Sequence, residues 1–194
     1  EEGRNPQVAY DPAAAAQMLA DAGWTDSDGN GFLDKDGQEF TMKISYLGSW
    51  ALMQAIAPLV YDNFRALGVN VELVPLDQAA ANEQIYNNTS VEKSYDAMLG
   101  GWGLFGPEPD HYRNYLANDT GFFAYANPEV VALFQQGRGV TDPDARYALY
   151  QQIDSLLWSD LPFIPIFQPI GVYVFRSDLN MDEAQVNGTF LTGM

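Results

Sequence analysis

Apolar and polar residues alternate in two segments of the first half of the chain, which predicts two β-strands. In residues 39–47 apolar side chains recur at every second position, and residues 69–76 repeat this pattern. Residues 49–68 lie between them and carry apolar side chains at helical spacing, with Ser49 as the expected N-cap. A strand–helix–strand unit of this kind predicts two parallel strands joined by a crossover helix.

Cap residues followed by proline indicate where other helices begin. Asp11 and Pro12 open a helix that we expect over residues 12–22. The same pairing of a cap with proline opens two longer helices at residues 127 and 142. The apolar face expected for the last of these helices holds Tyr147, Tyr150, Ile153, Leu157 and Trp158.

The remaining segments complete an alternation of helices and strands. Short helices are expected over residues 76–88 and 109–116, and a buried strand begins at residue 95. An apolar, proline-punctuated pair of strands is expected over residues 161–179, with Gly171 near the turn. The order of elements predicts a single α/β lobe, built on a mixed, mostly parallel sheet flanked by helices.

Composition and charge narrow the range of functions. The 194-residue chain carries a formal net charge of −17, which argues against nucleic acid as a partner because phosphate binding needs a basic surface. Cysteine is absent, so the chain has no disulfide, thiolate nucleophile or cysteine-based zinc site. The start of the chain has neither an initiator Met nor a signal-peptide pattern, which suggests a mature or excised fragment.

An acidic stretch, TDSDGNGFLDKDG over residues 25–37, resembles a calcium-binding loop. Asp26, Asp28, Asn30 and Asp34 occupy positions 1, 3, 5 and 9 of an EF-hand loop, and the Phe32 carbonyl would supply position 7. Position 12, where an EF-hand has a bidentate acid, is a glycine, and a strand follows where an EF-hand has a helix. The Asp-Gly and Asn-Gly pairs equally predict a tight hairpin without metal. Any calcium bound here would be structural.

A glycine-rich loop, GGWGLFGPEPDHY over residues 100–112, is the strongest candidate for ligand contact. Open α/β sheets bind ligands at the carboxyl ends of their strands, and this loop follows a predicted strand. Gly101 and Gly103 would let a ligand approach the backbone, and Trp102 offers a flat apolar wall. The alternative is that Trp102 and Phe105 are core residues beneath a loop.

Catalytic motifs are weak in this sequence, which argues against an enzyme. The single histidine, His111, has no G-x-S-x-G nucleophile motif to serve and no second zinc ligand at helical spacing. No phosphate-binding loop ending in Lys-Ser or Lys-Thr is present. Paired carboxylates of a glycosidase cannot be singled out among 26 acidic residues. A carbohydrate-active enzyme domain and a calcium-binding extracellular interaction module therefore stay open as alternatives.

Several motifs occur in an order that resembles one known family. They are DPAAAAQMLADAGW, DSDGNGFLDKDG, VNVELVPLDQAAANEQI, YDAMLGGWGLFGPEPDHY, DARYALYQQIDSLLWSDLPFIPIF and VYVFRSDLNMD. Together they are similar to the C-terminal lobe of family 5 extracellular solute-binding proteins, the dipeptide- and oligopeptide-type receptors of ABC importers. The resemblance implies a type II periplasmic-binding-protein-like lobe over residues 1–194, from which an N-terminal lobe is missing. Residues 181–194 would then be weakly anchored.

The resemblance also implies a function, a location and partners. Such a receptor captures a peptide or similar organic solute between its lobes and delivers it to a membrane permease. It is extracytoplasmic and generally monomeric, and it needs no cofactor. The ligand-binding residues expected from the motif and its surroundings are Gly101, Trp102, Gly103, Phe105, Asp110 and His111.

One position departs from the family's peptide-binding pattern. Peptide-binding members usually carry an Asp three residues after the Trp, and Phe105 stands there in this chain. This departure favours longer peptides, oligosaccharides or another organic solute over short free peptides. Asp110 follows, but it also fits an N-cap at the next helix start.

Overall fold

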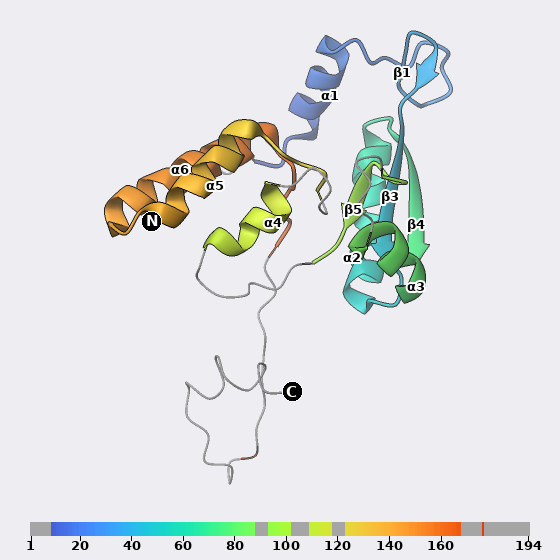
Figure 1. Ribbon diagram of the computed structural model, residues 1–194. Helices are drawn as coiled ribbons and strands as arrows, with labels where there is room; N and C mark the ends of the chain where they lie inside the picture. The colour runs from blue at the N-terminus through green and yellow to red at the C-terminus, as the bar shows by residue number, and fades with distance from the viewer. Residues whose placement is uncertain (1–8, 88–92, 102–108, 118–122, 168–175, 177–194) are drawn as a thin grey trace. The chain divides into compact units, whose positions relative to one another are not determined.

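The fold contains a three-stranded parallel sheet in the order β4-β3-β5 (Figure 1). The strands are β3 (Thr41–Leu47), β4 (Asn70–Leu76) and β5 (Ala97–Leu99). Ile44 of β3 pairs with Leu73 of β4 and with Ala97 of β5, which fixes the register on both sides. The expected parallel pairing of the first two strands is confirmed.

The computed structural model describes residues 9–87, 93–101, 109–117, 123–167 and 176. The chain divides into two units, Glu1–Pro162 and Phe163–Met194, and each is considered by itself. All helices and strands described below belong to the first unit.

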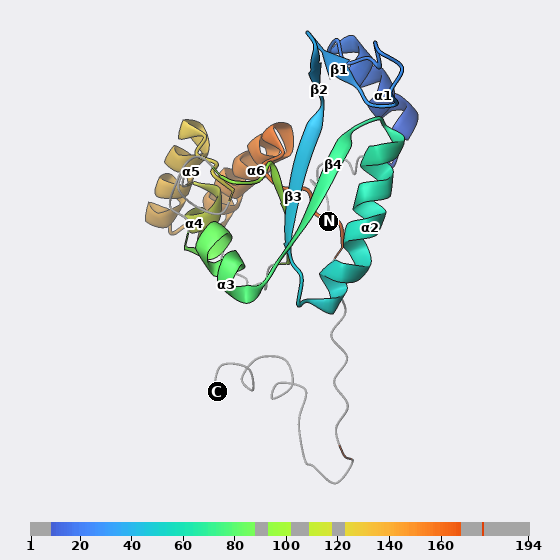
Figure 2. The same cartoon turned by 90° about the vertical axis from the view of Figure 1, so that its right-hand side faces the viewer.

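Helix α2 (Ala51–Ala66) covers one face of the sheet (Figure 2). Successive side chains of a strand point to opposite faces, so the apolar residues at alternate positions of β3 and β4 meet this helix. Each fully buried aliphatic side chain contributes about 1.5–3 kcal/mol. The buried residues of this core are Ile44, Met53, Ala57, Val69, Val71 and Leu99.

The opposite face of the sheet packs on α3 (Gln78–Ala81) and on η1 (Asn82–Tyr86), a single π-helical turn that continues it. The N-cap of α3 is Asp77, whose carboxylate accepts a hydrogen bond of 2.8 Å from the Ala80 amide. The buried residues of this second core are Leu76, Ala81 and Ile85. The short helix expected after β4 is therefore confirmed.

Helix α1 (Pro12–Asp21) begins as the sequence predicts, with the Asp11 carboxylate accepting from the Ala14 amide at 2.9 Å. None of its residues is buried. A two-stranded antiparallel hairpin, β1 (Asp34–Lys35) and β2 (Gln38–Glu39), follows it and leads into β3.

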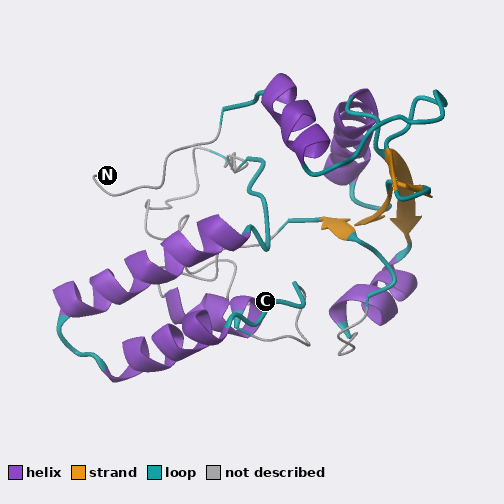
Figure 3. Cartoon of the chain, turned by 90° about the horizontal axis from the view of Figure 1, so that it is seen from above, coloured by secondary structure: helices purple, strands orange, loops and turns teal. Residues whose placement is uncertain are grey.

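A helical cluster follows the sheet in sequence: η2 (Pro109–Tyr112), a 3₁₀ turn, α4 (Arg113–Leu116), α5 (Pro128–Gly139) and α6 (Pro143–Asp160). Helices α5 and α6 lie side by side (Figure 3). The expected caps are confirmed, because side chains at 127 and 142 accept from the Glu129 and Ala145 amides. The buried core of this cluster is Leu116, Val130, Leu133, Phe134 and Ile153.

A hydrogen-bonded triad ties the start of α5 to the end of α6. The Tyr125 hydroxyl donates to Asp160 Oδ2 at 2.6 Å, and Asn127 Nδ2 donates to the same oxygen at 2.8 Å. These donors lower the pKa of Asp160. Burial, and then the neighbouring carboxylate, raise the pKa of Tyr125 to about 12.

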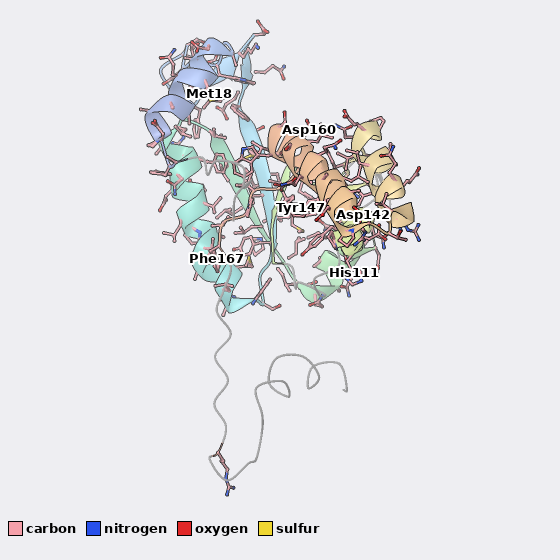
Figure 4. The ribbon with its side chains drawn as sticks, turned by 90° about the vertical axis from the view of Figure 1, so that its left-hand side faces the viewer. Met18, His111, Asp142, Tyr147, Asp160 and Phe167 are labelled. Carbon is pink, nitrogen blue, oxygen red and sulfur yellow. The ribbon has the colours of Figure 1, made fainter. Side chains whose placement is uncertain are left out.

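Two expectations about individual residues are wrong. The N-cap of α2 is Trp50 in extended conformation, not Ser49, and no side chain caps that helix. Tyr147, expected on the apolar face of α6, is 61% exposed and is labelled in Figure 4. Leu149 and Leu156 pack against the core of the helical cluster instead.

Helix α6 ends at Leu161, which adopts a left-handed conformation with φ of 48°. Residues 161–167 form neither helix nor strand, and most of the expected pair of strands over 161–179 lies outside the described residues. Across the described part of the chain, no helix has the length and apolar character that a membrane span requires. The single-lobe assignment and the weak anchoring of residues 181–194 stay predictions.

Candidate functional site

The chain connections of β3 and β5 diverge, and this divergence marks the place on the sheet where a ligand is expected. Helix α2 carries the chain from β3 to β4 on one side, whereas β5 pairs with the other side of β3. Parallel sheets bind ligands outside the carboxyl ends of two neighbouring strands at which the connections diverge in this way. The candidate site is therefore the carboxyl edge between β3 and β5.

Trp50 and Gly101 meet at this edge. Trp50 follows β3 and Gly101 follows β5, yet the indole ring lies directly against the glycine. A Cβ atom added to Gly101 would overlap Cη2 of Trp50 and would lie 3.0 Å from its Cζ3. The Trp50 side chain is nevertheless 39% exposed, and Gly101 is exposed as well.

Backbone hydrogen bonds hold the turn that carries Trp50. The Gly48 amide donates to the Leu76 carbonyl at 2.8 Å, which ties the turn after β3 to the end of β4. The Trp50 amide donates to the Leu47 carbonyl at 3.1 Å, and Gln54 Nε2 donates to the Gly48 carbonyl. The backbone that positions the indole ring is therefore fixed by bonds on both sides of it.

The structure describes only some of the ligand-binding residues predicted from the sequence. Gly101 lies at the carboxyl edge, as expected, whereas Trp102, Gly103 and Phe105 lie outside the described residues. Trp50 was not predicted, although it follows a strand end just as Trp102 does. The position of a tryptophan three residues after the end of a strand was the available signal.

Asp110 lies within η2 and forms ion pairs. Its carboxylate is 3.8 Å from Arg113 Nε and 3.6 Å from Arg138 Nε, with a quarter of its side chain exposed (25%). These contacts connect η2 with α5. The N-cap of α4 is Tyr112, so the alternative assignment of Asp110 as that cap is wrong.

His111 also belongs to η2. Its side chain is exposed, and Figure 4 labels it. Its proposed contact with a ligand, like that of Asp110, stays a prediction.

The acidic loop is a hairpin, as the Asp-Gly pairs predict. Strands β1 and β2 pair across Asp36 and Gly37, which both adopt positive φ angles of 53° and 77°. The loop packs onto the end of α2, because the Leu33 amide donates to the Gly68 carbonyl at 2.8 Å. A stacked pair of rings, Trp24 and Phe40, lies beside it with centroids 4.7 Å apart.

The loop's carboxylates accept hydrogen bonds from the loop itself. Asp26 accepts from the Gly29 and Gly31 amides at 2.8 and 3.0 Å. Asp34 accepts from the Ser27 hydroxyl and amide at 2.7 and 2.8 Å, and these bonds lower its pKa.

The predicted calcium ligands also converge in part. One oxygen from each of Asp26, Asp28 and Asp34 lies within 4.8 Å of the other two. Asn30 uses its amide oxygen to accept from the Phe32 amide at 2.8 Å.

Positive charge reaches the loop from α2. The Arg65 guanidinium carbon lies 3.6 Å from the centroid of the Phe32 ring, and Nη1 donates to the Gly31 carbonyl at 3.4 Å. Lys35 donates to the Ala22 carbonyl at 2.7 Å. Arg65 therefore partly offsets the repulsion among the acidic residues of the loop. The sequence pattern did not connect this residue with the loop.

A polar hollow of about 350 Å³ lies on the sheet near the amino ends of its strands. Its polar groups are partly satisfied by neighbours: the Lys43 amide donates to Asp96 at 2.7 Å, and Asn70 donates to Glu39 at 2.6 Å. This hollow is at the opposite end of the strands from Trp50 and Gly101. It is lined by Thr41, Met42, Lys43, Asn70, Glu72 and Asp96.

Both a family model and a curated relative that match this chain are of extracellular solute-binding or oligopeptide-binding proteins. The model of one family, described as bacterial extracellular solute-binding proteins, family 5 middle, matches residues 1–124. The oligopeptide-binding protein AppA of Bacillus subtilis is 28% identical over 168 residues, which are 84% of this chain and 30% of the relative. The chain thus spans under a third of that protein's length.

Solved structures show the same fold. AppA of Bacillus subtilis in complex with a nonapeptide matches with a TM-score of 0.72 and 27% identity, over 84% of this chain and 32% of that one. A mannohexaose-bound oligopeptide-binding protein of Thermotoga maritima matches with a TM-score of 0.68 and 23% identity, over 80% of this chain and 30% of that one. The predicted type II periplasmic-binding-protein-like fold is confirmed.

Proposed function

The chain belongs to family 5 of the bacterial extracellular solute-binding proteins, and we propose that it is the C-terminal ligand-binding lobe of an ABC-importer receptor. This receptor captures a peptide or similar organic solute and delivers it to the permease subunits in the membrane. The family match over residues 1–124 carries the proposal. The glycine- and tryptophan-bearing carboxyl edge of the sheet supports it, because that edge is where such sheets receive ligands.

The rest of the receptor follows from the same proposal. A second lobe, N-terminal to this one, completes the ligand site, since this chain spans only 30% of the length of AppA. The receptor is extracytoplasmic and monomeric, and it binds its solute without catalysing a reaction. The ligand contacts proposed from the sequence motif are residues 101, 102, 103, 105, 110 and 111.

Two ligand classes have support among the similar proteins. The AppA structure holds a nonapeptide, and the Thermotoga structure holds mannohexaose. The Phe residue at position 105, where peptide-binding members usually carry an Asp, favours longer peptides or oligosaccharides over dipeptides. We therefore place peptides of several residues first and oligosaccharides second.

The test is to identify what the full-length receptor binds. Purified protein is denatured, and the released small molecules are identified by mass spectrometry. The refolded protein is then titrated with a randomised nonapeptide pool and with mannohexaose. Saturable binding of either probe supports a receptor. Hydrolysis of a glycoside by the refolded protein, lost on substitution of one carboxylate, would instead make it an enzyme.

We also propose that the acidic loop binds calcium in a structural role. Support comes from the convergence of one oxygen from each of three Asp residues, 26, 28 and 34, within 4.8 Å. The Asn30 side chain and the Phe32 carbonyl would complete the set. Isothermal titration with calcium tests this proposal, with Asp28→Asn as the variant that should weaken binding. Absence of binding heat at millimolar calcium would remove the site.

A further inference from the structure

We propose that Trp50 is a ligand-contact residue whose indole ring, seated on Gly101, packs against a flat apolar group of the solute. This inference rests on the proposed receptor function and names a contact within it. The chemistry it predicts is an apolar ligand surface, from either a peptide side chain or the face of a sugar ring.

Position is the first argument. Trp50 follows the central strand β3, and Gly101 follows its neighbour β5, so their contact lies at the point where the chain connections diverge. A solute bound at this edge must pass close to the indole ring, because ligands occupy the crevice outside the two strand ends.

The second argument is that neither packing in the sheet cores nor capping of α2 accounts for Trp50 in the part of the chain that the structure describes. It is not among the residues that pack against either sheet core. It occupies the N-cap position of α2, where Ser, Thr, Asp or Asn would bond the first turn, and its side chain makes no such bond. The indole at this helix start is 39% exposed and so offers an aromatic surface to a ligand at the edge.

Gly101 supplies the third argument. The indole lies so close to Gly101 that even a methyl group on the glycine would overlap Cη2 of Trp50. The far edge of the ring, at Cη2 and Cζ3, is therefore supported by protein, while part of its surface stays open. A supported and backbone-anchored aromatic side chain loses little conformational freedom when a ligand stacks on it, which makes it an efficient contact surface.

The experiment compares three variants of the full-length receptor with the wild type: Trp50→Ala, Trp50→Phe and Tyr147→Ala. Tyr147 is the control because it is an exposed aromatic residue on a different element, α6, outside the proposed site. The probes are a randomised nonapeptide pool containing Phe, Tyr and Leu, a matched pool without large apolar residues, and mannohexaose. Circular dichroism verifies folding of each variant.

We expect the wild type to bind either the pool that contains Phe, Tyr and Leu or mannohexaose more tightly than it binds the pool without large apolar residues. The probe bound in this way is called the retained probe. Trp50→Ala should bind the retained probe about tenfold more weakly, Trp50→Phe should keep most of the affinity, and Tyr147→Ala should bind as the wild type does. Peptides and mannohexaose are separate arms, so the retained probe also identifies the source of the apolar surface.

A second pair of variants keeps the test decisive if Trp50→Ala does not fold. Gly101→Ala displaces the indole from its position against residue 101. This variant should bind several-fold more weakly the probe that the wild type binds. Gly139→Ala, at the end of α5 with open space around it, should leave binding unchanged. Hydroxyl-radical footprinting of the wild type should show slower oxidation of Trp50 when the probe is bound.

The failures of the two proposals are distinguishable. If the wild type binds a probe, but Trp50→Ala binds it equally well and Trp50 oxidation does not change, the inference about Trp50 is wrong and the receptor function stands. If the folded wild type binds neither peptide pool nor mannohexaose, the proposed function fails and the inference fails with it.

Discussion

The loops at the two ends of the three-stranded sheet differ in how far their side chains are engaged by contacts within the chain. At the amino end, a carboxylate of the acidic loop accepts hydrogen bonds from amides of the same loop. The loop also packs on the end of α2, where the Leu33 amide donates to the Gly68 carbonyl. At the carboxyl end, Trp50 rests on Gly101 and leaves 39% of its side chain exposed. A loop that closes on itself contributes stability, whereas an exposed and supported aromatic ring is available to a ligand.

Tryptophan substitutions at the two ends should produce the largest contrast. Trp24 at the amino end is half-buried and stacks on Phe40, with ring centroids 4.7 Å apart. Trp24→Ala should lower the free energy of unfolding by about 3 kcal/mol, because it removes this stack and leaves a cavity. Trp50→Ala should lower it by about 1 kcal/mol, since 39% of that residue is already exposed to water.

Urea unfolding followed by circular dichroism measures both changes. Equal losses of stability at the two ends would break the comparison, because the carboxyl-end tryptophan would then be a structural residue.

Glycine substitutions sharpen the comparison within the amino end. Gly68 has φ of +84°, and an added Cβ would lie 3.0 Å from Leu33 Cγ. Gly68→Ala should therefore cost about 2 kcal/mol, from backbone strain together with the contact. Gly29→Ala, with φ of +77° and open space around it, should cost about 1 kcal/mol from strain alone.

The unfolding midpoints of these two variants separate contact from strain. Identical midpoints would show that the packing of the loop on α2 contributes little.

The smallest expected effect is a pH dependence at the amino end. Hydrogen bonds from Ser27 lower the pKa of Asp34 from its usual 3.8, so its ionised form is favoured in the folded state. This contribution is fully present above about pH 5 and is lost as the pH falls below 3.8 through the folded pKa. Asp34→Asn should therefore make the melting temperature less sensitive to acid.

Thermal melts between pH 3 and 7 measure this effect, with Asp36→Asn as a charge-matched control. A steeper acid sensitivity in Asp34→Asn than in the wild type would contradict the assignment of those hydrogen bonds.

Local patterns determined much of the fold. Capping by Asp11 and by the side chains at 127 and 142 depends on residues two to three positions apart, and all three caps are present. The alternation of apolar residues predicted the strands and the face of each strand that packs on a core, because successive side chains of a strand point to opposite faces. The acidic hairpin followed from its Asp-Gly pairs for the same local reason.

Contacts between distant residues could not be predicted in this way. The pairing of Trp50 with Gly101 depends on β5 lying next to β3, and the contact of Arg65 with Phe32 depends on how α2 packs beside the hairpin. The ion pair between Asp110 and Arg138 joins η2 to α5. No periodicity within a single element specifies these neighbours.

The sequence by itself determined the element types, the family resemblance and the candidate ligand loop after β5. Only the tertiary structure decided that Trp50, beginning α2 without capping it, comes to rest at the same sheet edge. The physical reason is that helix and strand propensities act over a few residues, whereas a binding edge is assembled by the order in which strands pair.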